Sequence, residues 1–238
     1  MGYPSKKVSS PHAMLEIARK RIPGIEPVNL FGHSYNIGTD WKIIWAGVNA
    51  ISFPTSAVTL SLVSSSAADT MSVLVQGLDA NYNIISDIVT LNGTTPVLSS
   101  IPFFKINNAI ILSGSNAGNI TLGNNSNIYS FIVAETGVSQ ACYYSVPVGY
   151  SLYLFRIDAN SGTANGNKYI RIRNVVKSQN GRILKTAESS FIDTVSYDRQ
   201  IPFRIAEKSD FYFEAQSSSA TNEISIFVEA LLMENNNA

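Results

Sequence analysis

The sequence is short of the residue types that carry most catalytic and metal chemistry. Its 238 residues include one cysteine, Cys142, and two histidines, His12 and His33. A single cysteine allows neither an intrachain disulfide nor a cysteine-based metal cluster, and we interpret Cys142 as a small buried side chain. Two histidines leave little material for a hydrolytic triad or a zinc site. We therefore expect no catalytic residue, no metal site and no cofactor.

Charge is scarce as well. Asp, Glu, Lys and Arg make up 14% of the residues, and the formal net charge is +0. Soluble domains usually contain about 25% charged residues. A nearly neutral surface favours association, and hydrophobic residues, at 45%, suffice for a packed core. These properties predict a protein that works in an assembly. We expect a homo-oligomer, and a trimer is the form that we consider.

Long apolar runs are missing. No segment approaches the roughly 18 apolar residues of a membrane-spanning helix. The first residues also lack the apolar core of a secretory signal. We expect a protein that is made in a reducing cytoplasm and contacts no membrane.

The first forty residues differ from the rest of the chain. Ser10 and Pro11 suit a helix N-cap and first turn, and Ile22-Pro23-Gly24 ends the short helix that follows. Residues 25–40 show little periodicity, so we interpret residues 1–40 as a basic arm outside the core. Such an arm is able to fold on contact with a partner. The docking residues that we assign to it are Lys6, Lys7, Met14, Ile17, Arg19, Lys20 and Arg21.

From Trp41 onward, apolar and polar residues alternate with period two between frequent turn signals. This pattern is typical of short strands in β-sandwiches and barrels. The predicted fold class is mostly β, with two antiparallel β-sandwich (jelly-roll-like) domains at 41–134 and 135–238 behind the arm of 1–40. A single double-sheet jelly roll is the alternative. The expected strands are 57–63, 71–76, 82–91, 103–112, 119–122, 128–133, 141–146, 150–158, 169–177, 182–186, 203–206, 210–216 and 223–233.

One expected strand has a basic face. Tyr169, Arg171 and Arg173 share that face, because successive side chains of a strand alternate. An aromatic among arginines is able to bind single-stranded nucleic acid. The alternative is a solvated or interface-facing sheet with the intervening isoleucines in the core. Zero net charge argues against a dedicated nucleic-acid binder, so we favour the second interpretation.

Several carboxylates in the second half are candidates for the paired acids of a glycosidase. No pocket signal accompanies them, and we interpret them as loop or strand-edge charges. They are Asp193, Asp198, Glu207, Asp210 and Glu214.

A resemblance to a known family rests on the run from Val75 to Asn83, continued from Val89 to Val97. This run resembles a recurring segment of virion structural proteins from tailed phages, marine ones among them. The resemblance covers roughly residues 30 to 160 and implies a β-rich particle component located in a virion, with no catalytic residues to transfer. Its other parts are Trp41 to Trp45, Ser64 to Thr70, Asn119 to Thr121 and Tyr144 to Tyr150.

The favoured hypothesis is a bacteriophage capsid decoration or cement protein. It would be assembled in the host cytoplasm, dock through its N-terminal arm on the major capsid protein, and self-associate. The alternative is a tail, neck or fibre-attachment component that binds tail or neck proteins. A polysaccharide-cutting enzyme or a nucleic-acid binder is the third class.

Overall fold

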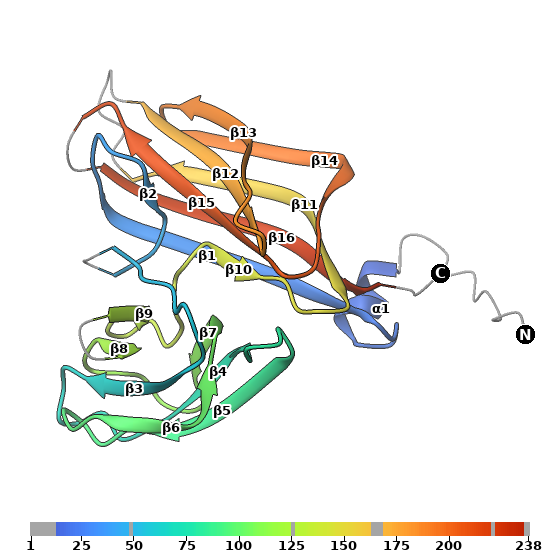
Figure 1. The fold of residues 1–238 in the computed structure, drawn as a ribbon. Coiled ribbons are helices and arrows are strands. Elements are labelled where there is room, and N and C mark those ends of the chain that lie inside the picture. The colour runs from blue at the N-terminus through green and yellow to red at the C-terminus, as the bar shows by residue number, and fades with distance from the viewer. Residues whose placement is uncertain (1–12, 48–49, 125–126, 163–168, 220–221, 236–238) are drawn as a thin grey trace, which may run out of the picture.

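A computed structural model describes residues 13–47, 50–124, 127–162, 169–219 and 222–235. Within these residues the chain forms sixteen strands and one short helix. The strands build two antiparallel β-sandwiches that lie side by side (Figure 1). The mostly β fold class predicted from the sequence is confirmed.

The larger sandwich has two sheets that enclose one apolar core. Alternate residues of one of its two longest strands, Ile224, Ile226 and Val228, point into that core, and Phe211, on a strand of the facing sheet, is also fully buried. The first sheet has the order β1 (Ile25–Ile37), β16 (Asn222–Glu234), β11 (Tyr150–Ser161) and β14 (Thr194–Ile205). The second has the order β10 (Tyr143–Ser145), β15 (Ser209–Ser217), β12 (Ile170–Ser178) and β13 (Ile183–Phe191), with β2 (Lys42–Ile43) also paired to β15.

The smaller sandwich has a separate core, which includes Leu60, Val75 and Phe103. Gly77 is required there by close packing, because a Cβ at this position would lie 2.0 Å from the carbonyl oxygen of Lys105. One sheet has the order β6 (Val97–Phe103), β3 (Val58–Ser64), β8 (Ile120–Asn124) and β9 (Asn127–Ile132). The other has the order β5 (Ile84–Thr90), β4 (Ser72–Leu78) and β7 (Lys105–Ile111).

The interpretation of residues 25–40 as an arm outside the core is wrong. β1 pairs with β16 from Ile25 to Ile37, and both Leu30 and Ile37 are buried. Gly32 lets this strand pass over Cys142, since a Cβ there would lie 2.6 Å from the Cys142 Cβ. Cys142 is fully buried, as expected, and burial raises the pKa of its thiol.

The larger sandwich takes strands from both ends of the chain. β1 and β2 belong to it together with the strands from β10 onward, and β3 to β9 are inserted between them. This grouping differs from the predicted ranges 1–40, 41–134 and 135–238, which placed β1 in the arm and β2 in the first β domain. The short helix, α1 (Ala13–Ala18), precedes β1 and ends before Lys20, which has a positive φ of 56°. Its predicted cap, Ser10 and Pro11, lies outside the described residues.

A buried ion pair joins the two sandwiches. The Lys105 ammonium on β7 lies 2.8 Å from the Asp210 carboxylate on β15, and the two side chains are 7% and 11% exposed. Asp210 also accepts hydrogen bonds from the Ser145 hydroxyl at 2.6 Å and the Tyr143 hydroxyl at 3.2 Å. Beside them, the Asn107 side chain bonds both backbone groups of Ser145, at 2.8 and 2.9 Å. The junction is therefore a dense polar cluster that removes both charges from most of their contact with solvent.

The two connections between the sandwiches also pair with each other. The Ala46 amide donates to the Gln140 carbonyl at 2.9 Å, and the Cys142 amide donates to the Ile44 carbonyl at the same distance. Both chain crossings are thus held by backbone bonds, which limits the freedom of one sandwich relative to the other.

Replacing Lys105 with methionine should strongly destabilise the protein. The Asp210 carboxylate would stay buried without its cation, and breaking one side of a buried pair costs about 3–5 kcal/mol of unfolding free energy. Denaturant unfolding measures the loss. The matched control is Arg156→Met, because Arg156 pairs with Asp158 at 2.7 Å on the exposed face. A loss for Lys105→Met no larger than that of the control would contradict the role of the ion pair.

A second buried carboxylate organises one end of the smaller sandwich. Asp69 is 1% exposed and accepts bonds from the Ser64 hydroxyl at 2.5 Å and from the Ala117 and Gly118 amides at 2.8 and 2.9 Å. Desolvation alone would raise the pKa of this carboxyl, but the three hydrogen bonds outweigh it and lower the pKa below 3.8. The connection from β3 to β4 and the loop before β8 are thereby joined through a single ionised side chain.

The lowered pKa of Asp69 predicts a specific loss of stability in acid. Because its folded pKa lies below the unfolded value of 3.8, its contribution is complete above that pH and is lost as the pH falls through the folded pKa. Asp69→Asn should therefore cost about 1.5–3 kcal/mol at neutral pH. The difference from the wild type should shrink as the pH falls below 3.8. Thermal or denaturant unfolding at several pH values checks this, and a pH-independent difference would contradict it.

Candidate interaction surfaces

The predicted docking helix presents only part of the expected surface. Met14 and Leu15 are 58% and 45% exposed, but Ile17 is buried and therefore unable to contact a partner. Arg19 and Arg21 lie 3.5 and 3.3 Å from Glu16 on the same segment. The remaining predicted residues are Lys20, which lies in this turn, and Lys6 and Lys7, which lie outside the described residues.

The two arginines of the basic strand face lie on β12 and are paired with residues from elsewhere in the chain. Arg173 lies 2.6 Å from Glu214 on β15, and the two side chains are 13% and 17% exposed. Arg171 pairs with Glu188 on β13, and Tyr169 at the end of the strand is half exposed. These ion pairs satisfy the cationic groups that a nucleic acid would need.

Trp41 completes this cluster and was not assigned to it from the sequence. Its ring lies 3.9 Å from the Arg173 guanidinium and 5.3 Å from that of Arg171, so the indole stacks on both cations. Trp41 is 130 residues before Arg171, and no sequence signal relates them. The aromatic partner that single-strand binding requires is present, but it is occupied by the arginines of its own chain.

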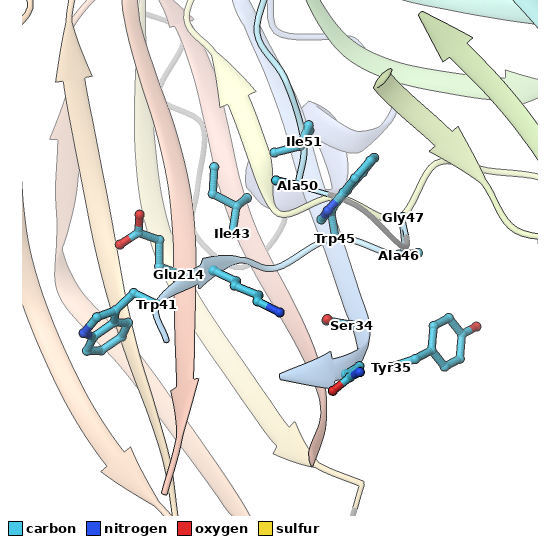
Figure 2. A pocket seen from close by; sticks show the side chains of 12 residues that line it. Ser34, Tyr35, Trp41, Ile43, Trp45, Ala46, Gly47, Ala50, Ile51 and Glu214 are labelled. Carbon is cyan, nitrogen blue, oxygen red and sulfur yellow. The ribbon is translucent and has the colours of Figure 1, made fainter. Parts of the chain in front are cut away.

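A cavity of about 410 Å³ lies next to Trp41 (Figure 2). Trp41 and Tyr35 lie at opposite sides of it and point apart, so the aromatic side chains do not converge on one ligand position. Glu214 is the single carboxylate of the described lining and already binds Arg173. The lining residues are Ser34, Tyr35, Asn36, Trp41, Lys42, Ile43, Trp45, Ala46, Gly47, Ala50, Ile51 and Glu214.

A serine, a histidine and a glutamate meet on the outer face of the first sheet. His33 Nδ1 lies 2.8 Å from the Ser225 hydroxyl, and Nε2 lies 3.0 Å from Glu223. Burial lowers the pKa of His33, although Glu223 acts in the opposite direction. Ser225 is the fourth residue of β16, which pairs with β1 on one side and β11 on the other. Its local backbone is committed to the sheet, so this trio lacks the free amides of an oxyanion hole and acts as a tie between β1 and β16.

Three of the carboxylates considered for a glycosidase form ion pairs or hydrogen bonds within the fold. Asp210 and Glu214 form ion pairs with Lys105 and Arg173, and Glu207 accepts a bond from the Gly149 amide at 2.5 Å. In the described part of the chain, no group of three or more His, Cys, Asp or Glu residues is arranged to hold a metal ion. Among the same residues, no helix is long and apolar enough to cross a membrane.

A group of exposed apolar side chains was not predicted from the sequence. It lies on β13, β14 and the turn that joins them, at one edge of the larger sandwich (Figure 1). Ile201 is 83% exposed, and six consecutive residues of β13 from Ile183 to Glu188 are exposed. The other large exposed apolar side chains here are Leu184, Ile192 and Tyr197.

Comparisons with known proteins identify no relative. No protein-family model matches the sequence, and no curated protein matches it. Among solved structures, the chain is similar to VP2 of the infectious bursal disease virus subviral particle, with 10% identity, a TM-score of 0.25, and coverage of 90% of this chain and 73% of that one. The structure of the virus's Gt strain gives 11% identity, a TM-score of 0.17 and coverage of 90% and 79%. TM-scores this low establish no common fold.

Removing both arginines from the basic strand face should leave nucleic-acid binding unchanged. Arg171→Gln with Arg173→Gln removes two cations that already bind glutamates, so no phosphate contact is lost. Retention on a single-stranded DNA column at several salt concentrations measures this. Lys42→Gln with Lys177→Gln, two exposed lysines, is the charge-matched control. Salt-dependent retention that disappears only in the arginine variant would overturn this interpretation.

Proposed function

We propose that the chain is a structural component of a virus particle and acts by binding copies of itself and other particle proteins. The observation that carries this proposal is that charged side chains bind partners within the chain, whereas several large apolar side chains face solvent. The buried charges and the arginines of the basic strand face form ion pairs within the chain, such as Lys105 with Asp210 and Arg173 with Glu214. Large apolar side chains remain exposed on α1 and on β13–β14. A surface of this kind favours docking with a partner.

The resemblance to virion structural proteins of tailed phages supports the particle setting. Its longest run, from Val75 to Val97, begins within β4, includes β5 and ends at the first residue of β6 in the smaller sandwich. Within that setting, we propose a capsid decoration or cement protein. A protein that binds only the assembled shell stabilises it by mass action, without any chemistry of its own.

The docking element of this proposal is the exposed side of α1. The side chains of Met14 and Leu15 are exposed to solvent there, next to the turn that contains Lys20. A short helix with an apolar face and a neighbouring cation fits a groove on a partner such as the major capsid protein. A tail or neck component, docked by the same element, is the second candidate, and copy number separates the two. Densitometry of purified particles should give hundreds of copies for a shell protein and about a dozen or fewer for a tail protein.

Charges placed on the exposed side of α1 should block incorporation without unfolding the protein. The double variant Met14→Asp with Leu15→Asp would place two carboxylates in the proposed interface, where they would lose their water. Neither side chain belongs to a core, so the substitutions should leave the fold intact. We expect incorporation to fall at least tenfold, and we expect the same loss when residues 1–24 are deleted. Quantitative gels of purified particles measure it.

The matched control is Ile84→Asp with Ile88→Asp on β5. Ile84 and Ile88 are 57% and 59% exposed, so two aspartates are again placed at exposed apolar sites, here on the smaller sandwich. Circular dichroism and the unfolding midpoint report whether each variant folds. Normal incorporation of the folded α1 variant would show that this helix is not the docking element.

A further inference from the structure

We propose that β13 pairs antiparallel with β13 of a second copy of this chain. The pairing deepens the self-association in the proposed function, and it rests on the register and charges of this one strand. Among the described residues, β13 pairs only with β12, so its other edge carries unpaired backbone groups. The nine residues from Ile183 to Phe191 contain no proline and no glycine. A long edge without proline keeps all of its outward backbone donors, so another strand is able to pair with it.

The register of β13 gives its two charges a shared face. Arg173 on β12 lies opposite Glu188, and Val175 lies opposite Lys185. Arg173 and Val175 are two residues apart and point to the same side of the sheet. Lys185 and Glu188 therefore also share a side, although they are three residues apart. The extra residue at Thr186, where the register shifts, is a β-bulge that makes this possible.

This arrangement is self-complementary. When two copies of β13 run antiparallel about an axis between Thr186 and Ala187, Lys185 of each copy lies opposite Glu188 of the other. Opposite residues in an antiparallel pair must project from the same face, and the bulge meets that condition here. A two-fold interface repeats each contact, so both ion pairs form. A regular strand with the same two charges would place them on opposite faces.

The neighbouring contacts extend this match. Glu188 already binds Arg171 on β12, so each dimer edge would carry a row of alternating charge across three strands: Arg171, Glu188, and Lys185 of the other copy. Ile183 and Leu184, which are 54% and 38% exposed, would lie opposite Ser190 and Ser189 and lose water contact. Backbone bonds supply the affinity, and the charges select the register.

Charge exchange between two variants tests the pairing. Lys185→Glu places two glutamates opposite two glutamates, and Glu188→Lys places lysines opposite lysines. Each variant alone should dimerise about tenfold more weakly than the wild type, because attraction becomes repulsion on both sides of the axis. An equimolar mixture restores both opposite-charge contacts, so its heterodimer should recover wild-type affinity. Sedimentation equilibrium at low salt measures the three cases, since salt screens exposed pairs.

Two further measurements keep the test decisive. Lys42→Glu, an exposed lysine on β2, makes the same charge change away from the edge and should leave the dimer unaltered. In the unaltered protein, a zero-length carbodiimide reagent should yield a covalent dimer joined between Lys185 and Glu188, identified by peptide mass spectrometry. This second measurement stands even where a variant folds poorly.

The outcomes separate this inference from the proposed function. A wild type that stays monomeric at all concentrations, or a mixture no tighter than either variant, overturns the β13 pairing. Particles that still incorporate such a monomer would leave the proposed function standing. A charge-dependent dimer that never enters particles would confirm the pairing and remove the particle role.

Discussion

The Lys105–Asp210 ion pair is the constraint on which the relation of the two sandwiches depends. Two charges withdrawn from water are costly unless their geometry is good and their remaining bonding capacity is used. Here Tyr143 and Ser145 bond the carboxylate from the larger sandwich, while Lys105 reaches it from the smaller one. Any rotation of one sandwich against the other would expose or separate the charges. The pair therefore contributes more to orientation than to net stability. This agrees with the inserted connectivity, in which both chain crossings are also tied to each other.

Apart from β2, a two-residue strand that was also missed, the strands that the sequence failed to predict share a physical cause. β1 and β6 were missed, as were all but the last few residues of β14. Each of these strands contains a proline, which is Pro27 in β1, Pro102 in β6 and Pro202 in β14. All three lie at the edge of a sheet. An edge strand tolerates proline because one side of its backbone has no partner, and it tolerates polar residues because it is incompletely covered. Both properties erase the period-two pattern. Strands inside the sheets, such as β3, β4 and β16, keep that pattern and were predicted from it.

The candidate surfaces divide along a similar line. Alternation correctly placed Arg171 and Arg173 on one face of β12, because that property is local. Their partners, Trp41 and Glu214, come from distant segments that no periodicity connects. The same holds for α1, where the composition indicated an apolar face but not which residue the fold would cover. Ile17 is buried by tertiary packing, and Met14 is left outside. Local chemistry is therefore readable from one sequence, whereas the satisfaction of a charge or an apolar side chain is decided by tertiary contacts.

Edge protection also explains why β13 stands apart. A β-rich, weakly charged chain with many unpaired strand edges risks unlimited stacking. Proline in β1, β6 and β14 removes one backbone donor from each of those edges. β13 has no proline and carries instead a bulge with one cation and one anion beside it. Those charges repel most registers and partners, but they match a second copy placed about a two-fold axis. The bulge and the two charges of β13 thus oppose stacking with other strands but allow one symmetric pairing with a second copy. A pair related by a two-fold axis cannot grow into a fibre through the same edge.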